Sequence, residues 1–157
     1  MSEQPNIAEQ LQRLIDIEEI RSLRTRYSHV LDSGKVEGFH DVFTDDAVVA
    51  VTVGKMEGIE AIKMGLGEAY ETFDYRKARN YPFMHAVTNH SVSITSTVEA
   101  EGFCYLLDWV TGREAGHPVL LLGLYADKYR RENGKWKIYH TKLDVVWQHE
   151  DLGPLSR

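Results

Sequence analysis

The stretch Tyr129-Arg130-Arg131-Glu132-Asn133-Gly134-Lys135-Trp136-Lys137 decides how the second half of the chain folds. Asn-Gly adopts the positive φ angles of a two-residue hairpin turn at little cost, so the flanking stretches are predicted to pair as antiparallel strands. These stretches are residues 117–130 and 136–147. Before them, residues 84–95 and 99–111 are also strand-like and meet at a turn. The second half is therefore predicted to be one antiparallel meander.

The first half of the chain is mainly helical. A capping box from Asn6 to Glu9 opens a helix that ends just before Gly34, a residue suited to the positive φ that follows a helix. A second box, Asp16-Ile17-Glu18-Glu19, either restarts or merely kinks this helix. The apolar positions recur at helical spacing: they are Ile17, Ile20, Leu23, Tyr27, Val30 and Leu31.

Two further helices are expected, over residues 36–43 and from about 59 to 70, on either side of a strand at residues 47–53. Helices first and strands later indicate an α+β fold rather than a parallel βαβ fold. The chain of 157 residues fits one domain, residues 1–157, with one core.

Composition excludes several classes of protein. The formal net charge is −6 and no basic stripe is present, so no nucleic-acid partner is expected. Met1-Ser2-Glu3-Gln4-Pro5 lacks the features of a signal peptide, and no apolar run is long enough to span a membrane. We therefore expect a cytoplasmic protein with no membrane partner. The lone Cys104 lies in an apolar strand pattern and is expected to be a small buried hydrophobe rather than a nucleophile.

Asp32 is the first candidate for a functional residue, because it lies in the last turn of the first helix. A carboxylate is disfavoured there by the negative end of the helix dipole. Either Asp32 is a turn residue that faces water, or it has a function that compensates. Tyr27 lies on the inward stripe of the same helix, either as a core aromatic or as part of a site.

Several motifs together resemble a known family. They are Ile17-Glu18-Glu19-Ile20-Arg21 with Tyr27 and Asp32, Phe43-Thr44-Asp45-Asp46-Ala47, Gly58-Ile59-Glu60-Ala61-Ile62, His85 in a strand, and the hairpin at residues 129–137. Over about residues 10–147 the chain resembles the SnoaL-like branch of the nuclear transport factor 2-like superfamily. The resemblance implies a cone-shaped α+β barrel, with N-terminal helices packed on a strongly curved, mostly antiparallel sheet.

Within this superfamily the pattern is similar to scytalone dehydratase, bile-acid 7α-dehydratase and hexachlorocyclohexane dehydrochlorinase. The resemblance implies an Asp–His pair at Asp32 and His85, with Tyr27 beside it. The last two of these enzymes also use an arginine near the last strand, where residues 141–146 here offer only Lys142.

Such a site implies a cofactor-independent lyase that eliminates water from a hydrophobic cyclic small molecule. His85 is expected to act as general base, Asp32 to orient and charge-stabilise its ring, and Tyr27 to donate a hydrogen bond. A double-bond isomerase or cyclase would use the same base. A non-catalytic ligand-binding or assembly protein of the same fold is the alternative from another class.

No metal site is predicted, because the seven histidines form neither HxH nor HExxH. His85 and His90 are five residues apart on a strand and are expected to face opposite sides of the sheet. His140 shares parity with Trp136 and Ile138, which makes it a candidate for the pocket wall or a structural histidine.

Three more residues are candidates for substrate contacts. Phe83 ends an aromatic loop over residues 73–84, which either closes over a pocket or merely crosses the surface. Tyr105 and Trp109 share one face of their strand, as a pocket wall or an oligomer contact. Asp108 between them is expected on the outer, solvated face, with a second acid in the pocket as the alternative.

The apolar run at residues 119–124 carries leucine on both faces of its strand. A strand of this kind is typically covered on both sides. We therefore expect a homo-oligomer, either a dimer or a trimer, in which a second copy covers the outer face.

Overall fold

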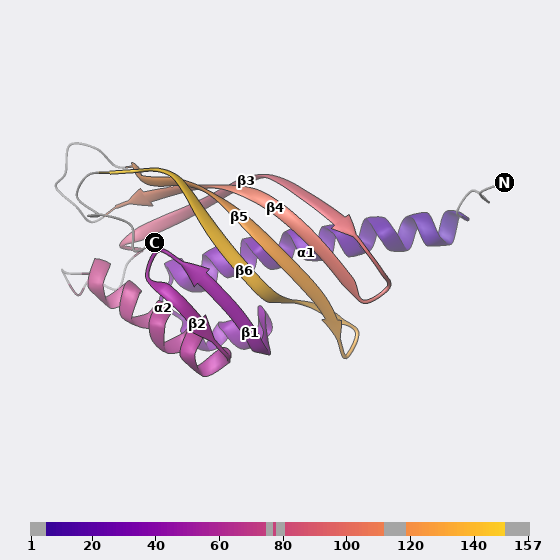
Figure 1. Ribbon diagram of the computed structural model, residues 1–157, viewed down its shortest axis with the longest axis horizontal. Helices are drawn as coiled ribbons and strands as arrows, with labels where there is room; N and C mark the ends of the chain where they lie inside the picture. The colour runs from indigo at the N-terminus through magenta and orange to yellow at the C-terminus, as the bar shows by residue number, and fades with distance from the viewer. Residues whose placement is uncertain (1–5, 75–76, 78–80, 112–118, 150–157) are drawn as a thin grey trace.

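A computed structural model describes residues 6–74, 77, 81–111 and 119–149. Helices cover one face of a single six-stranded sheet (Figure 1). The elements in chain order are α1 (Ile7–Asp32), the 3₁₀ helix η1 (Val36–Asp41), β1 (Phe43–Val51), β2 (Gly54–Glu57), α2 (Ile59–Phe73), β3 (Phe83–Ile94), β4 (Glu99–Val110), β5 (Val119–Glu132) and β6 (Lys135–Gln148). The predicted α+β class is confirmed.

The helix α1 begins and ends where the sequence predicts. The Asn6 side chain accepts a hydrogen bond from the Glu9 backbone, and the Glu9 side chain accepts one from the Asn6 backbone. Gly34 follows the helix with φ at +68°, and an added Cβ there would lie 2.8 Å from the Tyr70 ring. The helix runs unbroken through Asp16, so the predicted restart or kink is wrong: the Asp16 side chain instead binds Gln12 and Arg131.

The predicted hairpin is confirmed. Asn133 and Gly134 have φ of 51° and 79°, and Glu132 pairs with Lys135 across the turn. Strands β3 to β6 form the antiparallel meander, and β1 joins β6 in parallel. The sheet order is β2-β1-β6-β5-β4-β3, so β2 and β3 are its edges and the barrel is open along one side.

Two predicted elements differ in detail. The helix expected over residues 36–43 is a 3₁₀ helix that ends at Asp41, and β1 starts at Phe43, four residues before the expected strand.

Parts of two expected loops lie outside the described residues. They are positions 75–76 and 78–80 of the loop at 73–84, and the loop at 112–116.

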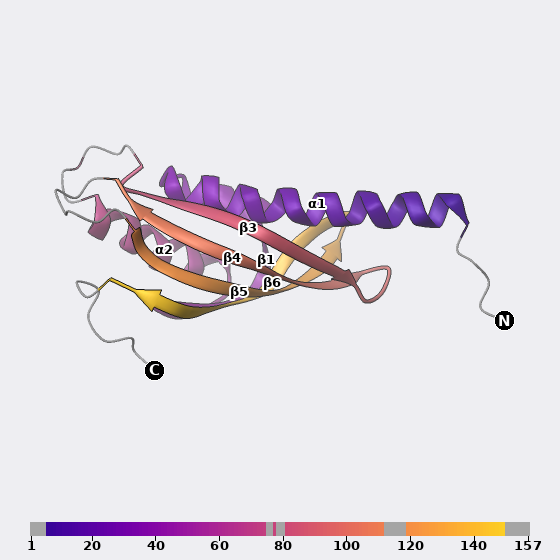
Figure 2. The same ribbon diagram turned by 90° about the horizontal axis from the view of Figure 1, so that it is seen from above.

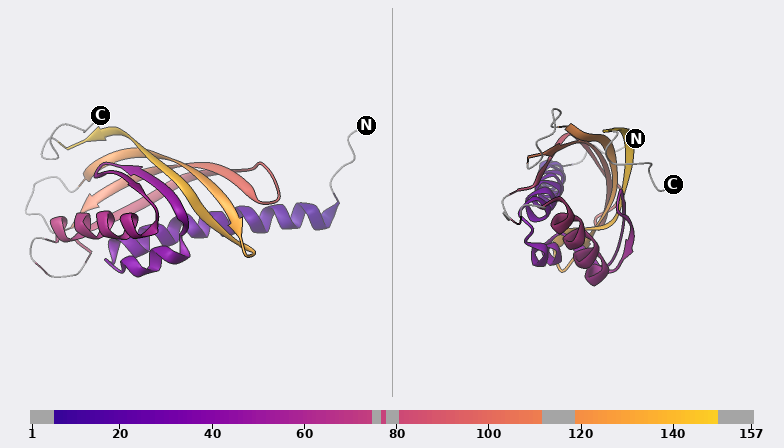
Figure 3. Two further views of the ribbon diagram at one scale, coloured as in Figure 1. Left: turned by 60° about the horizontal axis from the view of Figure 1, so that its bottom comes forward. Right: turned by 90° about the vertical axis from the view of Figure 1, so that its left-hand side faces the viewer.

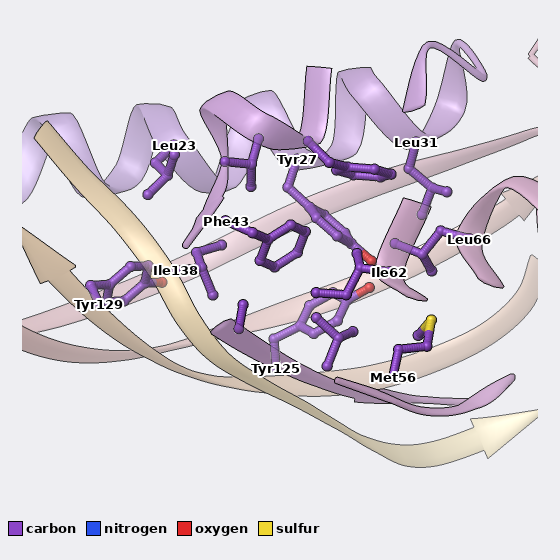
Figure 4. Packing of buried hydrophobic residues seen from close by; sticks show 14 of the residues in the cluster. Leu23, Tyr27, Leu31, Phe43, Met56, Ile62, Leu66, Tyr125, Tyr129 and Ile138 are labelled. Atoms are coloured by element: carbon purple, nitrogen blue, oxygen red, sulfur yellow. The ribbon is translucent and has the colours of Figure 1, made fainter. Parts of the chain in front are cut away.

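The core lies between α1, η1, α2 and the concave face of the sheet, which curves around the helices (Figures 2 and 3). Tyr27 sits at its centre, with ring centroids 5.8 Å from both Phe39 and Phe43 and 6.0 Å from Tyr125 (Figure 4). Cys104 is fully buried, as expected from its strand pattern. The C-terminal half of α1 is thus pinned to the sheet, and this places Asp32 against β3.

The opposite, convex face of the sheet carries large apolar side chains that are exposed in the single chain. We call this set the convex patch: Phe103, Tyr105, Trp109, Leu122, Val146 and Trp147. Residues on β4 alternate strictly, with the even-numbered ones buried up to Val110. Tyr105 and Trp109 therefore point away from the helices, and their predicted place in a pocket wall is wrong.

Candidate active site

Asp32 and His85 form the centre of the candidate site. Asp32 Oδ1 lies 2.6 Å from His85 Nδ1, and Asp32 Oδ2 accepts a hydrogen bond of 2.9 Å from the His85 backbone N–H. Asp32 is only 4% exposed. The carboxylate at the end of α1 therefore binds the start of β3 through both of its oxygens and is not a solvated turn residue. With Nδ1 held by the carboxylate, Nε2 is the nitrogen that is left for chemistry.

Asp108 is a further candidate for a functional residue, and it lies on the inner face of the sheet rather than on the outer face that the sequence analysis expected. It lies directly across from His85 in the β3–β4 pairing, with Oδ2 3.8 Å from His85 Nε2. It is 6% exposed, and Oδ1 has no hydrogen-bond partner among the described residues. The expectation of a solvated outer face fails because Asp108 shares its parity with Cys104 and Leu106. That parity was the signal in the sequence that identified the inward face.

The two acids change the proton affinity of the site. Burial raises the pKa of Asp108 to about 6, although the His85 charge opposes that rise. Burial disfavours the His85 imidazolium, but the charges of Asp108 and Asp32 outweigh it and raise the pKa of His85 above its usual value. Because His85 and Asp108 lie 3.8 Å apart, the proton affinity of each depends on the charge of the other.

Tyr27 reaches the same site from one turn earlier on α1. It is 1% exposed, and its hydroxyl is hydrogen-bonded to that of Tyr125 on β5. The two phenol oxygens lie side by side in Figure 4. The sequence did not single out Tyr125, because only the pairing of β5 in the sheet brings it under α1.

A cavity of about 60 Å³ connects these groups. Four of its lining residues are polar and able to transfer or bind a proton: Tyr27, His85, Asp108 and Tyr125. Most of the others are apolar, and Phe83 is one of them, stacked edge-on at 5.2 Å from the His85 ring. Phe83 as a substrate contact stays a prediction.

His140 does not line this cavity. The β5–β6 pairing shifts register between Lys128 and Tyr129, where Ile138 pairs with Tyr129 and His140 with Lys128. Tyr139 is the extra residue of this bulge, and a bulge reverses the facing of the residues beyond it on the strand. Thr141 is consequently the buried residue, and the predicted parity of His140 with Trp136 and Ile138 is wrong.

A bulge also changes the relation between His85 and His90. The β3–β4 pairing shifts between Thr88 and Ser91, and Asn89 there has φ of 53°. His85 and His90 therefore both turn toward the helix side, contrary to the expectation of opposite faces. Their partners differ: His90 Nε2 lies 3.1 Å from the Tyr129 hydroxyl.

Neither a metal cluster nor a membrane span is found in the described residues. No group of three or more His, Cys, Asp or Glu there is arranged to hold a metal ion. Likewise, no helix within residues 6–74, 77, 81–111 and 119–149 is long and apolar enough to cross a membrane.

Comparison with solved structures places this architecture among similar folds. A provisionally assigned scytalone dehydratase from Novosphingobium aromaticivorans is 23% identical with a TM-score of 0.74, covering 87% of this chain and 88% of that one. A hexachlorocyclohexane dehydrochlorinase from Novosphingobium barchaimii is 21% identical with a TM-score of 0.71, covering 89% and 92%. At these identities the likeness establishes the fold alone.

Comparison of sequences establishes the family. Over 120 residues the chain is 31% identical to terrestric acid biosynthesis cluster protein E from Penicillium crustosum, which covers 72% of each chain. The SnoaL-like domain model matches residues 12–142, a range that holds Tyr27, Asp32, His85 and Asp108. The chain therefore belongs to the SnoaL-like domain family.

Proposed function

We propose that this protein is a cofactor-independent lyase of the dehydratase type. The observation that carries the proposal is the 2.6 Å contact between Asp32 and His85 Nδ1, with Nε2 on the cavity side beside Asp108. A base needs one ring nitrogen free and the other fixed, and this arrangement supplies both.

In the proposed reaction, His85 Nε2 removes a proton from the carbon next to a carbonyl group. The electron pair of that C–H bond forms the new C=C bond, and the C–O bond at the β-carbon breaks. Protonated Asp108 gives its proton to the departing hydroxyl, which leaves as water, and Asp32 stabilises the imidazolium that forms. Because His85 and Asp108 face each other across neighbouring strands, the two proton transfers occur on one side of the substrate, as in a syn elimination.

This scheme needs neutral His85 and protonated Asp108 at the same time. The pair must therefore share a single proton, which is the state between the pKa of about 6 at Asp108 and the raised pKa of His85. We expect a bell-shaped dependence of kcat/KM on pH, with its maximum in that interval.

The cavity limits the substrate to a small and largely apolar reacting group. At about 60 Å³ it is smaller than the ~150 Å³ engineered cavity that holds one benzene ring. A single-ring substrate therefore enters only when the lining side chains move, and it displaces fewer of them than a polycyclic substrate would. Any larger substrate would present only one end to His85, unless the lining side chains move.

The relatives support elimination chemistry without defining the substrate. One similar structure is a dehydrochlorinase and another a provisionally assigned dehydratase, and the curated relative belongs to a biosynthesis cluster. An isomerase or cyclase using the same base is the nearest alternative. The binding or assembly alternative is less well supported, because it predicts an unpaired or blocked His85.

The convex patch supports the further proposal of a homo-oligomer. Exposed apolar side chains gathered on one face favour coverage by a second copy. Sedimentation of the purified protein would show a dimer or trimer. A monomer at micromolar concentration would contradict this proposal and leave the lyase proposal intact.

The direct test uses 3-hydroxycyclohexanone, a single-ring β-hydroxy ketone. Wild-type protein should form the conjugated enone, seen by its ultraviolet absorbance, and His85→Ala should not. Conversion of 3-cyclohexenone to the conjugated isomer without dehydration would favour the isomerase alternative. If neither ketone reacts and neither exchanges its α-hydrogens in D₂O above the buffer rate, the proposed chemistry is wrong for this class of compound.

A further inference from the structure

Arg24 is a buried cation beside the two phenols of the cavity. It lies one turn before Tyr27 on α1 and is fully buried. Its guanidinium carbon lies 3.5 Å from the Tyr125 ring centroid and 4.3 Å from that of Tyr27. No step of the proposed elimination uses it.

The ion partner of Arg24 is Asp127 on β5. Asp127 Oδ2 is 3.5 Å from Arg24 Nε, and the same carboxylate accepts hydrogen bonds from Tyr129 at 2.9 Å and Thr141 at 2.8 Å. Asp127 does not line the cavity, whereas Tyr27 and Tyr125 do. The cation therefore contacts the phenol rings directly, and the compensating anion is held by other groups.

The charges around the cavity make this cation significant. Asp32 is a buried carboxylate beside His85, so a negative charge that develops on a substrate would be repelled by it. A guanidinium on the face of a phenol draws electron density from the ring and makes the O–H a stronger donor. Burial raises the pKa of the Tyr27 hydroxyl, and the Arg24 charge opposes that rise.

A contribution to the stability of the fold does not by itself explain a buried arginine at this position. A buried ion pair contributes little net stability, since well-packed apolar side chains of the same volume often do as well. No nitrogen of Arg24 makes a hydrogen bond within the described residues. Its position does supply a fixed positive charge behind the hydrogen-bonded pair of phenols that lines the cavity.

We propose that Arg24 is a positioning residue that strengthens the hydrogen bond which the Tyr27–Tyr125 pair donates to a negatively charged substrate oxygen. This inference rests on the proposed function and narrows its substrate class. The substrate carries a carbonyl or similar group whose oxygen becomes negative when His85 removes the proton. A haloalkane, which develops its charge on the leaving group, would gain nothing from Arg24.

Nitroethane tests this inference because it is a small carbon acid. His85 Nε2 would take a proton from the carbon next to the nitro group, and the electron pair would move onto the nitro oxygens. In D₂O a deuteron returns to that carbon, so exchange measured by NMR reports the proton transfer without a leaving group. Exchange by the wild-type protein and its loss in His85→Ala would establish the base.

Arg24→Met is the decisive variant, and Arg26→Met is its matched control. Both remove one positive charge from α1, but Arg24 is buried against the rings of Tyr27 and Tyr125, whereas Arg26 is exposed. We expect Arg24→Met to lower kcat for exchange by about tenfold to a hundredfold, since the charge acts only in the transition state. KM for neutral nitroethane should stay within about twofold. Arg26→Met should leave both parameters unchanged.

Asp127→Asn separates the charge of Arg24 from its packing. This variant keeps the cation and removes its counter-charge, so kcat should equal or exceed that of the wild type. If Arg24→Met does not fold because Asp127 is left unpaired, the double variant Arg24→Met/Asp127→Asn removes both charges and should show the same loss of kcat.

The outcomes distinguish the two proposals. Absence of exchange in the wild type would overturn the proposed function. Exchange in the wild type with full kcat in Arg24→Met, or in the double variant, would overturn the role of Arg24 alone. The same holds for a rise in KM that accounts for the loss, or for an equal loss of kcat in Asp127→Asn, because either would mean that Arg24 only supports the fold.

Discussion

His85 and His90 lie five residues apart on β3, face the same side of the sheet, and have opposite environments. The His85 ring lies between two carboxylates, with Asp32 at 2.6 Å and Asp108 at 3.8 Å. The His90 ring meets the neutral hydroxyl of Tyr129 at 3.1 Å. The pKa of His85 is raised, whereas burial, aided by the charges of Arg24 and Arg21, lowers the pKa of His90 although Asp127 opposes this.

The difference shows that the partners, rather than the residue type, decide what a buried histidine does. A ring between two acids changes its charge near neutral pH and can move a proton. A ring against a phenol, close to arginines, stays neutral and serves as a fixed hydrogen-bonding group. His85 also lines the cavity, whereas His90 does not.

The largest expected effect separates the two histidines directly. His85→Ala should lower kcat/KM for the β-hydroxy ketone by about a hundredfold or more, because the base is lost. Asp32→Asn should cause a similar loss, since the ring would lose its orientation and charge partner. His90→Ala is the matched control and should keep turnover within about threefold. Comparable losses in His85→Ala and His90→Ala would remove the functional distinction between them.

The second effect concerns the acid that faces His85. Asp108→Asn should lower kcat by about tenfold to a hundredfold, because the leaving hydroxyl loses its proton donor. The alkaline limb of the pH profile should disappear with it. The remaining acid limb should then report His85 alone, whose pKa should lie below its wild-type value because the Asp108 charge no longer raises it. An unchanged bell-shaped profile in this variant would exclude Asp108 as the acid.

The fold could be predicted from the sequence because its signals are local. Each boundary is set by the backbone conformation of a few neighbouring residues. The capping box at Asn6 begins α1, Gly34 follows its end, and Asn133-Gly134 forms the turn between β5 and β6. Their order identifies the α+β class. Asp32 stood out from its place at the end of the helix, and the resemblance to a known family paired it with His85, which is 53 residues away and shares no local motif with it.

The parts of the site that the sequence missed depend on strand parity and register. A bulge at Tyr139 reverses the facing of His140, and the shift at Asn89 reverses that of His90. Neither bulge has a strong local signal, so alternation counted through them fails. Asp108 was expected on the outer face for another reason: a second acid in the pocket was the alternative and its inward parity was readable, but the cost of a buried carboxylate argued against it. Tyr125 and Arg24 could not be identified from the sequence, because only the packing of β5 against α1 brings their side chains together.

Stability should also distinguish the two histidine sites, with a smaller effect. The pKa of Asp108 is about 6 when folded and about 3.9 when unfolded, so the folded state binds more protons between these values. The stability due to protonated Asp108 is therefore lost as pH rises from about 4 to about 6. His85 has the same effect, because its pKa is raised in the folded state: the stability due to its protonated ring is lost as pH rises through that pKa.

Asp108→Asn should accordingly gain about 3 kcal/mol in free energy of unfolding at pH 7 relative to the wild type, and little at pH 4. Urea denaturation at the two pH values measures this. His90→Ala is the control, because its lowered pKa gives no such gain at neutral pH. A loss of stability in Asp108→Asn that is equal at both pH values would mean that its packing, not its charge, dominates.

The smallest effect tests the bulge that places both histidines on one face. Asn89 has a positive φ of 53°, which asparagine tolerates and alanine does not, so Asn89→Ala should cost about 1 kcal/mol in free energy of unfolding. Asn89→Gly should stay within a few tenths of that of the wild type, because glycine accepts the same φ. Ser91→Ala, exposed on the same strand, controls for loss of a polar side chain. Equal stability of the alanine and glycine variants would mean that the backbone at Asn89 does not hold the left-handed conformation in solution, and the shared facing of His85 and His90 would then lose its structural cause.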